Sequence, residues 1–295
     1  MQAIILAAGY GTRLRPYTDI RPKPLFPVLN RPLLHLLLAQ LQSCGCYPMV
    51  VNSHHLATQI EAALGAWPDV FYQFEPEILG TGGSLRKALS RFTDEPILVM
   101  NGDLYHRIDL HRVYRHHVLS ENDVTLALHA YPRFSNVEVQ GDRVSGFGCN
   151  GSRCLAFTGI HVIEPGTAAR IPDGGFFHII DLYRELAKEG RVGYCRVDGS
   201  LWRDIGTPAD YLQLHEELLV QHGDPAWLIA PDARIGSQVV LQGWGCVGPG
   251  AVVGDRAQLS CSVVWDGAEV MPGSVHTQSI VTGHGQAESQ RRNRG

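Results

Sequence analysis

Short apolar runs alternate with longer amphipathic stretches from the N-terminus to residue 221. The apolar runs predict buried strands at Ile4–Ala8, Met49–Asn52, Val70–Phe74 and Ile97–Met100. The stretches between them predict helices over Leu33–Ser43, Leu56–Leu64 and Gly83–Phe92. This alternation predicts an α/β domain over residues 1–221, with an open, mostly parallel sheet covered by helices on both faces. Ligands of such sheets bind beyond the carboxyl ends of the strands.

A different pattern follows the linker at residues 222–226. Apolar side chains recur at every sixth position: Ile229, Ile235, Leu241, Val247, Val253, Leu259, Trp265 and Met271. A six-residue period is typical of a parallel β-helix, so we expect a short left-handed β-helix of hexapeptide repeats over residues 228–283. Because stacked coils with open ends often pair, we also expect a homo-oligomer. Residues 284–295 are polar and predict a disordered tail.

Glycines and one tryptophan within the repeat allow further predictions. Glycines at positions 236, 248 and 254 follow three of the apolar positions and predict tight corners. Trp265 is large for the interior of a coil, which indicates either the widening end of the coil or an interface.

The first predicted strand ends in a polar, glycine-containing loop. Gly9 and Gly11 are separated by a single residue, and Arg13 and Lys23 add fixed positive charge. Backbone N–H groups of such a glycine turn cradle phosphate oxygens, and the cations suit phosphate too. The loop is neither a dinucleotide-binding loop, since Leu14 stands at its third glycine position, nor a P-loop, which needs Gly-Lys-Ser/Thr. It predicts a nucleotide with several phosphates.

The segment from Gly9 to Pro24 resembles the signature of the sugar-1-phosphate nucleotidyltransferases, the NDP-sugar pyrophosphorylases. The resemblance extends over nearly the whole chain and is greatest to mannose-1-phosphate guanylyltransferases and N-acetylmuramate-1-phosphate uridylyltransferases. It implies a Rossmann-like sheet, catalytic roles for Arg13 and Lys23, and nucleotide contacts from two segments. The implied nucleotide-binding residues are Leu6, Ala8, Gly9, Gly11, Thr12, Glu75, Gly80, Thr81 and Gly82.

Two aspartates far apart in the sequence are candidate metal ligands. Asp103 follows the strand ending at Met100, and Asp204 stands in Trp-Arg-Asp-Ile-Gly-Thr; each lies close to a glycine. Magnesium (Mg2+) prefers oxygen and is usually held by one or two carboxylates with phosphate oxygens. The family has a magnesium-binding aspartate in both motifs. The alternative is that each aspartate caps a turn or helix.

The base and the sugar stay open at this stage. A carboxylate from Glu75 or Glu77 suits the N–H donors of guanine, although uridylyltransferases of similar sequence also have glutamate here. For the sugar, the resemblance implies Asn101, Thr158 and Gly159, while the alternative for Thr158–Gly159 is a plain strand with a bulge. A lysine that contacts the sugar phosphate in many relatives is missing, and the candidates to replace it are Arg143, Arg153 and Arg203.

Composition and charge limit the partners and the location. A net charge of -4 supplies no driving force for nucleic acid or anionic membrane. The seven cysteines lack zinc-site spacing and suggest no disulfide framework. The N-terminal apolar run is too short for a signal peptide or membrane span. We therefore expect a cytoplasmic enzyme. The histidines between His54 and His117 are expected at the surface or in loops.

Together these features predict a reaction of NTP with sugar 1-phosphate that yields NDP-sugar and pyrophosphate. In-line attack on the α-phosphorus needs positioning and charge neutralisation more than a strong base. Two alternatives remain. One is a non-catalytic regulatory or scaffold subunit of the same fold. The other is a cytidylyltransferase for a phosphorylated alcohol.

Overall fold

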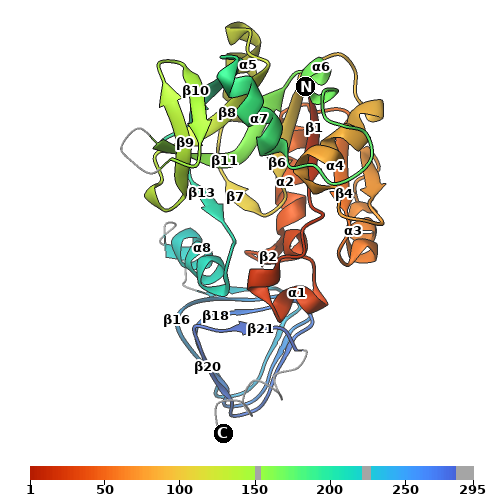
Figure 1. Cartoon of the computed structure of the whole chain (residues 1–295). Helices are drawn as coiled ribbons and strands as arrows, with labels where there is room; N and C mark the ends of the chain where they lie inside the picture. The colour runs from red at the N-terminus through yellow and green to blue at the C-terminus, as the bar shows by residue number, and fades with distance from the viewer. Residues whose placement is uncertain (150–153, 221–226, 284–295) are drawn as a thin grey trace, which may run out of the picture. The chain divides into compact units, whose positions relative to one another are not determined.

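The computed structural model describes residues 1–149, 154–220 and 227–283, and the chain forms two compact units (Figure 1). Unit 1 comprises residues 1–10, 22–24 and 34–202, and unit 2 comprises 11–21, 25–33 and 203–295. The predicted linker at 222–226 and the predicted disordered tail at 284–295 lie outside the described residues. The chain therefore passes between the two units several times before residue 34.

Unit 1 is built on a nine-stranded sheet in the order β5-β4-β1-β6-β11-β8-β12-β10-β9 (Figure 1). Its strands are β1 (Gln2–Leu6), β4 (Met49–Ser53), β5 (Val70–Phe74), β6 (Ile97–Asn101), β8 (Val124–His129), β9 (Ser135–Gln140), β10 (Arg143–Phe147), β11 (Cys154–Ile163) and β12 (Val192–Arg196). The four strands predicted from apolar runs pair in parallel, as expected. The later strands β9, β10 and β11 pair antiparallel with their neighbours.

Helices cover both faces of this sheet. Residues 124, 126 and 128 of β8 belong to one core cluster with α4 and α7, whereas Thr125 of β8 contacts His117 of α5. Since successive strand residues point to opposite faces, α5 lies on the face opposite to α4 and α7. The helices are α2 (Leu33–Ser43), α3 (Ala57–Leu64), α4 (Gly80–Ala88), α5 (Leu110–Ser120), α6 (Pro165–Ala168) and α7 (Ile179–Lys188), with short helices η3 (Leu89–Arg91) and η4 (Pro132–Phe134). Among the described residues, no helix is both long and apolar enough to cross a bilayer.

One short strand and one short helix span the points where the chain passes between the units: β13 (Trp202–Asp204) and η2 (Lys23–Leu25). The short strand β7 (Leu104–His106) belongs to unit 1. The N-terminal segments of unit 2 hold η1 (Thr12–Leu14), α1 (Tyr17–Ile20), β2 (Pro27–Val28) and β3 (Arg31–Pro32).

The rest of unit 2 contains α8 (Pro208–Val220) and parallel strands stacked in successive coils (Figure 1). One ladder joins β14 (Trp227–Ile229), β16 (Val240–Val247), β18 (Gln258–Val264) and β20 (Val275–Thr277), and β21 (Ile280–Val281) also pairs with β18. A second ladder joins β15 (Arg234–Ile235), β17 (Val252–Val253) and β19 (Glu269–Val270). Leu241 pairs with Leu259, three hexads further on, whereas Val247 pairs with Val264, one position short of three hexads. The coil between β16 and β18 is thus shortened by one position at the carboxyl end of these strands.

This shortening changes which side chain fills the coil. Val264, rather than Trp265, joins the core cluster of the coils. Trp265 is fully buried elsewhere in unit 2, with its ring 4.7 Å from the ring of Phe26 and its Nε1 donating to the hydroxyl of Tyr211 at 3.2 Å. Of the two expectations for Trp265, the structure favours an interface, because the ring lies outside the core cluster of the coils and contacts other segments of unit 2. It packs against α8 and an N-terminal segment.

The glycines of the repeat are needed for close stacking rather than for tight corners. A Cβ on Gly236, Gly248 or Gly254 would lie 2.5–2.6 Å from a backbone nitrogen of the next coil. None of the three has the positive φ of a left-handed turn. The predicted glycine positions are correct, but the physical reason is van der Waals contact between coils.

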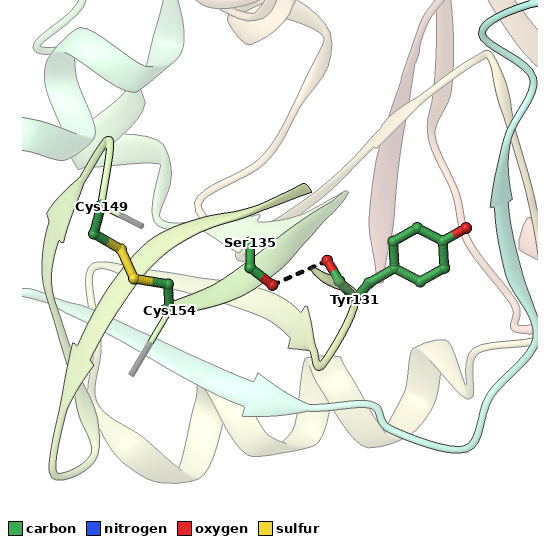
Figure 2. The surroundings of a disulfide bond; sticks show 4 residues. All are labelled: Tyr131, Ser135, Cys149 and Cys154. Atoms are coloured by element: carbon green, nitrogen blue, oxygen red, sulfur yellow. Dashed lines mark hydrogen bonds between the residues drawn. A yellow bond between two sulfur atoms is a disulfide. The ribbon is translucent and has the colours of Figure 1, made fainter. Parts of the chain in front are cut away.

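A disulfide joins Cys149 to Cys154, at the start of β11 (Figure 2). Cys154 pairs across the sheet with Glu138 of β9. The sequence suggested no disulfide framework, whereas the Cα atoms of Cys149, after β10, and Cys154, of β11, lie 6.3 Å apart and the two side chains pair. The other five cysteines are free.

Candidate functional site

Two strand ends meet at the start of the glycine-containing loop. Leu6 of β1 lies beside Asn101 of β6, and the N–H of Gly102 donates to the carbonyl of Leu6 at 2.8 Å. A Cβ on residue 102 would lie 3.2 Å from the Cβ of Ala7. Asp103 therefore follows directly from the strand edge where Ala7 to Tyr10 begin. This is the carboxyl end of the parallel strands, as the sequence predicted.

Lys23 and Asp103 form an ion pair at this edge. The Nζ of Lys23 lies 2.7 Å from Oδ2 of Asp103. The lysine side chain is 8% exposed, and the aspartate side chain is 36% exposed. The two candidates come from sequence positions 80 residues apart, and the structure joins them. A carboxylate that is partly open to solvent keeps an oxygen for a further cationic ligand.

A buried polar network holds the loop from behind. The side chain of Asn52 accepts from the N–H of Ala7 at 2.6 Å and donates to Glu75 at 2.8 Å and to Ser84 at 2.9 Å. Glu75 is fully buried, and its other oxygen faces the N–H of Leu79 at 3.5 Å. Both carboxylate oxygens of Glu75 are thus engaged within the protein. Contact between Glu75 and a base stays a prediction that this geometry does not favour.

The glycine segment at the start of α4 is packed against another part of unit 1. The N–H of Gly82 donates to the carbonyl of Phe177 at 2.9 Å, and the hydroxyl of Thr81 accepts from the N–H of Ile179 at 3.1 Å. A Cβ on Gly80 or Gly82 would lie 2.7 Å from Phe177. The glycines therefore allow this chain to approach closely. A cavity of about 350 Å³ opens beside them, and the exposed Glu77 lines it.

In unit 2 the second half of the signature loop meets the second aspartate. Gly11 has φ 61°, and η1 follows with Arg13 on it. The guanidinium of Arg13 lies 3.9 Å from Oδ2 of Asp204. A Cβ on Gly206 would lie 2.7 Å from that same oxygen and 3.1 Å from the guanidinium. Any larger residue at position 206 would displace one member of the Arg13–Asp204 ion pair. This ion pair joins two motifs from distant parts of the chain.

Two of the three predicted sugar residues, Thr158 and Gly159, lie at a bulge in β11, and the third, Asn101, ends β6. Gly159 has φ 77°, and a Cβ there would lie 2.7 Å from Nδ2 of Asn101. Thr158 is fully buried, and its hydroxyl donates to the carbonyl of Ala127 at 2.8 Å and accepts from the N–H of Ile160 at 3.2 Å. Thr158 thus stabilises the bulge from within, and its contact with a sugar stays a prediction. Asn101 and Gly159 are neighbours, as a shared site requires.

Two of the three arginines that could replace the missing lysine contact side chains of other elements. Arg143 contacts Asn122, which precedes β8 at the edge opposite to Asp103. Arg203 donates to Glu217 of α8 at 2.7 Å. Arg153 lies outside the described residues.

Several histidines lie in the core. His106 and His117 are buried, contrary to the expectation of surface or loop positions. Burial lowers the pKa of His106 and His215 to about 4 and that of His161 to about 3. These imidazoles are neutral at pH 7 and supply no charge for phosphate. The sequence misled because apolar neighbours, not spacing, signal a buried histidine.

The sequence reasoning missed an aromatic group at the carboxyl end of β8. The rings of His129 and Tyr131 stack at 5.3 Å, and Trp202 packs edge-on against both. The indole Nε1 of Trp202 donates to the carbonyl of Thr158 at 2.8 Å. The group therefore holds the strand with the bulge. In the Trp-Arg-Asp motif, the sequence predicted roles for Arg203 and Asp204 but not for Trp202.

The chain is similar to known nucleotidyltransferases in sequence and in fold. The model of the family described as "Nucleotidyl transferase" matches residues 2–138. A mannose-1-phosphate guanylyltransferase of Mycobacterium tuberculosis is 28% identical, over 93% of this chain and 82% of that protein. An N-acetylmuramate alpha-1-phosphate uridylyltransferase of Neisseria meningitidis is 31% identical, over 70% of this chain and 94% of that protein. The solved structure of HddC from Yersinia pseudotuberculosis, at 22% identity and TM-score 0.63, covers 74% of this chain and 99% of its own, a likeness of fold.

Proposed function

The chain belongs to the nucleotidyl transferase family, and we propose that it joins a nucleoside triphosphate to a sugar 1-phosphate. An oxygen of the sugar phosphate attacks the α-phosphorus in line. The bond from the α-phosphorus to the bridging oxygen breaks, and its electron pair leaves with pyrophosphate. The product is an NDP-sugar. The phosphate nucleophile is already ionised at neutral pH, so no side chain needs to remove a proton.

The observation that supports this proposal most directly is the presence of two lysine or arginine ion pairs with aspartate. Lys23 and Asp103 meet beside the strand end in unit 1, and Arg13 and Asp204 meet in unit 2. All four stand in the sequence motifs on which the resemblance to the family rests. The loop that connects them, from Gly9 to Thr12, supplies backbone N–H groups to the triphosphate. A non-catalytic subunit of this fold would have no reason to keep both pairs.

The roles of the two cations differ by their exposure. Arg13 is 63% exposed and free to turn to the phosphates that leave. Lys23 is almost buried, and its ammonium stays close to Asp103, where it neutralises charge on the reacting phosphates. Stabilising the charge that develops during transfer accounts for most of the rate in chemistry of this kind.

We propose magnesium as the cofactor, held by Asp103 and Asp204. Both donors are carboxylates, and the described residues contain no cluster of three or more potential metal ligands. Two carboxylates fit an ion that takes its remaining ligands from phosphates and water. When bound, magnesium would neutralise phosphate charge as a Lewis acid.

We further propose that the coils of unit 2 are a left-handed β-helix of hexapeptide repeats and that its exposed apolar side chains support a homo-oligomer. Paired strands are offset by three hexads, or by one position less, which supports three sides per coil. Met271 and Val275 are each more than 60% exposed on these coils. Size-exclusion chromatography with light scattering measures the mass in solution and so tests the homo-oligomer separately from the transferase reaction.

The nucleotide and the sugar are left to experiment. Guanosine and uridine nucleotides are proposed first, because relatives named for each are similar to this chain. The test is a screen of four NTPs against mannose, glucose, N-acetylglucosamine, N-acetylmuramate and heptose 1-phosphates. Pyrophosphate release that needs both an NTP and a sugar phosphate supports the proposal. Release with a phosphorylated alcohol and CTP instead would identify the cytidylyltransferase alternative, and no release with any pair would favour the non-catalytic subunit.

A further inference from the structure

A basic cavity in unit 1 is lined by none of the residues considered so far as catalytic or binding candidates. It has a volume of about 510 Å³, within the range of small-molecule sites. Residues of α5, of the end of β12 and of the turn from β9 to β10 line it. Its polar lining comprises Arg112, Arg115, His116, Asp142, Tyr194 and Arg196. We refer to it as the α5 pocket.

The charges of the α5 pocket are gathered and unbalanced. Arg112 and Arg115 stand one turn apart on α5, so their side chains extend from the same face of the helix. Across the part of the chain that the structure describes, neither guanidinium forms a hydrogen bond or ion pair with another side chain. Arg196 lines the same cavity and donates to Asp198 at 2.5 Å. Like charges at this spacing repel, and an anion between them would remove that cost.

The pocket also has an apolar wall. Leu119 is 77% exposed on α5, although it is among the larger apolar side chains. Tyr194 stands opposite on β12, and its hydroxyl donates to the carbonyl of Gly141 at 2.9 Å, which holds the turn in place. β10 pairs with β12 only at Arg143 and Gly193, so the strand after residue 193 has an open edge that shapes the cavity.

We propose that the α5 pocket binds a small phosphorylated metabolite. Its phosphate contacts the guanidinium groups of Arg112 and Arg115, which suit phosphate oxygens through paired N–H donors. Its carbon body lies against Leu119 and Tyr194. Asp142 stands at the same cavity, so a ligand with a hydroxyl group near that carboxylate is favoured over a fully anionic one. This site is independent of the proposed transferase reaction.

Hydrogen bonds connect the α5 pocket to the aromatic group at the carboxyl end of β8. Asp198, the partner of Arg196, accepts from the N–H of Ala130 at 2.7 Å. Ala130 joins His129 and Tyr131 of the aromatic group that holds the β11 bulge. A phosphate that draws Arg196 away from Asp198 would loosen this link. Binding is the primary claim, and any effect on turnover follows from it.

The test is isothermal titration calorimetry on the full chain with three probes: inorganic phosphate, fructose 1,6-bisphosphate and fructose. The variant R112Q/R115Q removes the two unpaired cations. The matched control R184Q/K188Q removes two exposed cations one turn apart on α7. A second variant, L119E, places a carboxylate at the apolar wall. Turnover with the substrates identified in the screen checks that the variants are folded and that binding is not at the transferase site.

We expect saturable binding of the bisphosphate, none of fructose, and weaker binding of inorganic phosphate. R112Q/R115Q should weaken bisphosphate binding by about 100-fold, since each charged hydrogen bond accounts for roughly a factor of ten. L119E should weaken it too, while R184Q/K188Q should not. Equal binding to R112Q/R115Q and the unmodified protein would overturn the proposal. So would the lack of saturable binding of both phosphate-bearing probes up to about 10 mM, beyond the range of useful affinity.

Discussion

Replacing Lys23 with alanine separates a catalytic role from a structural one. The lysine is 8% exposed and lies 2.7 Å from an aspartate that is 36% exposed. A charged hydrogen bond contributes about 1.5–3 kcal/mol to stability. Because water can reach Asp103 once the lysine is gone, we expect Lys23→Ala to lower the free energy of unfolding by only about 1–2 kcal/mol.

The expected loss of turnover is larger than the loss of stability. Removing one group that stabilises transition-state charge lowers kcat by about 100- to 1000-fold, or about 3–4 kcal/mol. Steady-state pyrophosphate release measures kcat, and differential scanning calorimetry measures the stability change, about 2–8 °C in Tm. Lys188→Ala, an exposed lysine on α7, is the matched control and should change neither value.

One result would contradict a catalytic role for Lys23. If Lys23→Ala lowers Tm as expected while kcat and KM stay unchanged, the lysine only supports the fold around Asp103. A loss of rate at low sugar phosphate that disappears at saturation, with kcat unchanged and KM raised, would instead place Lys23 in ground-state binding.

Three further predictions follow from other parts of the molecule. Gly206→Ala should displace the carboxylate of Asp204 and lower kcat at least about tenfold, whereas Gly166→Ala, with open space around it, should not; equal activity of both would argue against a role for the carboxylate. The stability that depends on neutral, buried His161 should be full above pH 6.5 and fall as pH drops toward about 3, because burial lowers the pKa of this imidazole in the folded protein. Urea unfolding at several pH values should show a shallower loss of stability for His161→Leu than for the exposed His111→Gln, by up to about 1.4 kcal/mol per pH unit. Thiol titration of the unfolded, unreduced chain should count five free thiols, and a count of seven would exclude the disulfide.

The sequence supported the parts of the site that depend on chain order. Strand ends were predictable to within two residues because the apolar runs stop at Ala8 and Met100, and the strands themselves end at Leu6 and Asn101. Parallel pairing then brings the ends of both strands to one edge. The Arg13–Asp204 pair was reachable only through the family motifs, since most of the chain lies between the two side chains.

What the sequence could not decide is where a polar side chain points. Glu75 and Thr158 stand in the expected motifs, yet their oxygens bond within the core. Trp265 follows the six-residue spacing, yet one shortened coil moves Val264 into the interior in its place. Such outcomes depend on register and packing between distant segments, which no local spacing records.

Trp265 also has a consequence for how this chain can be shortened. Its ring is buried against Tyr17 and Phe26, and Arg21 both covers it and pairs with the neighbouring Asp266. A fragment ending at residue 221 would retain every proposed catalytic residue and lose this cover. The segment that carries Thr12 and Arg13 would then lose its anchorage first. The coils thus stabilise the segment that contains Thr12 and Arg13 through the contacts of Trp265 and Asp266. We therefore expect the fragment without the coils to lose transferase activity.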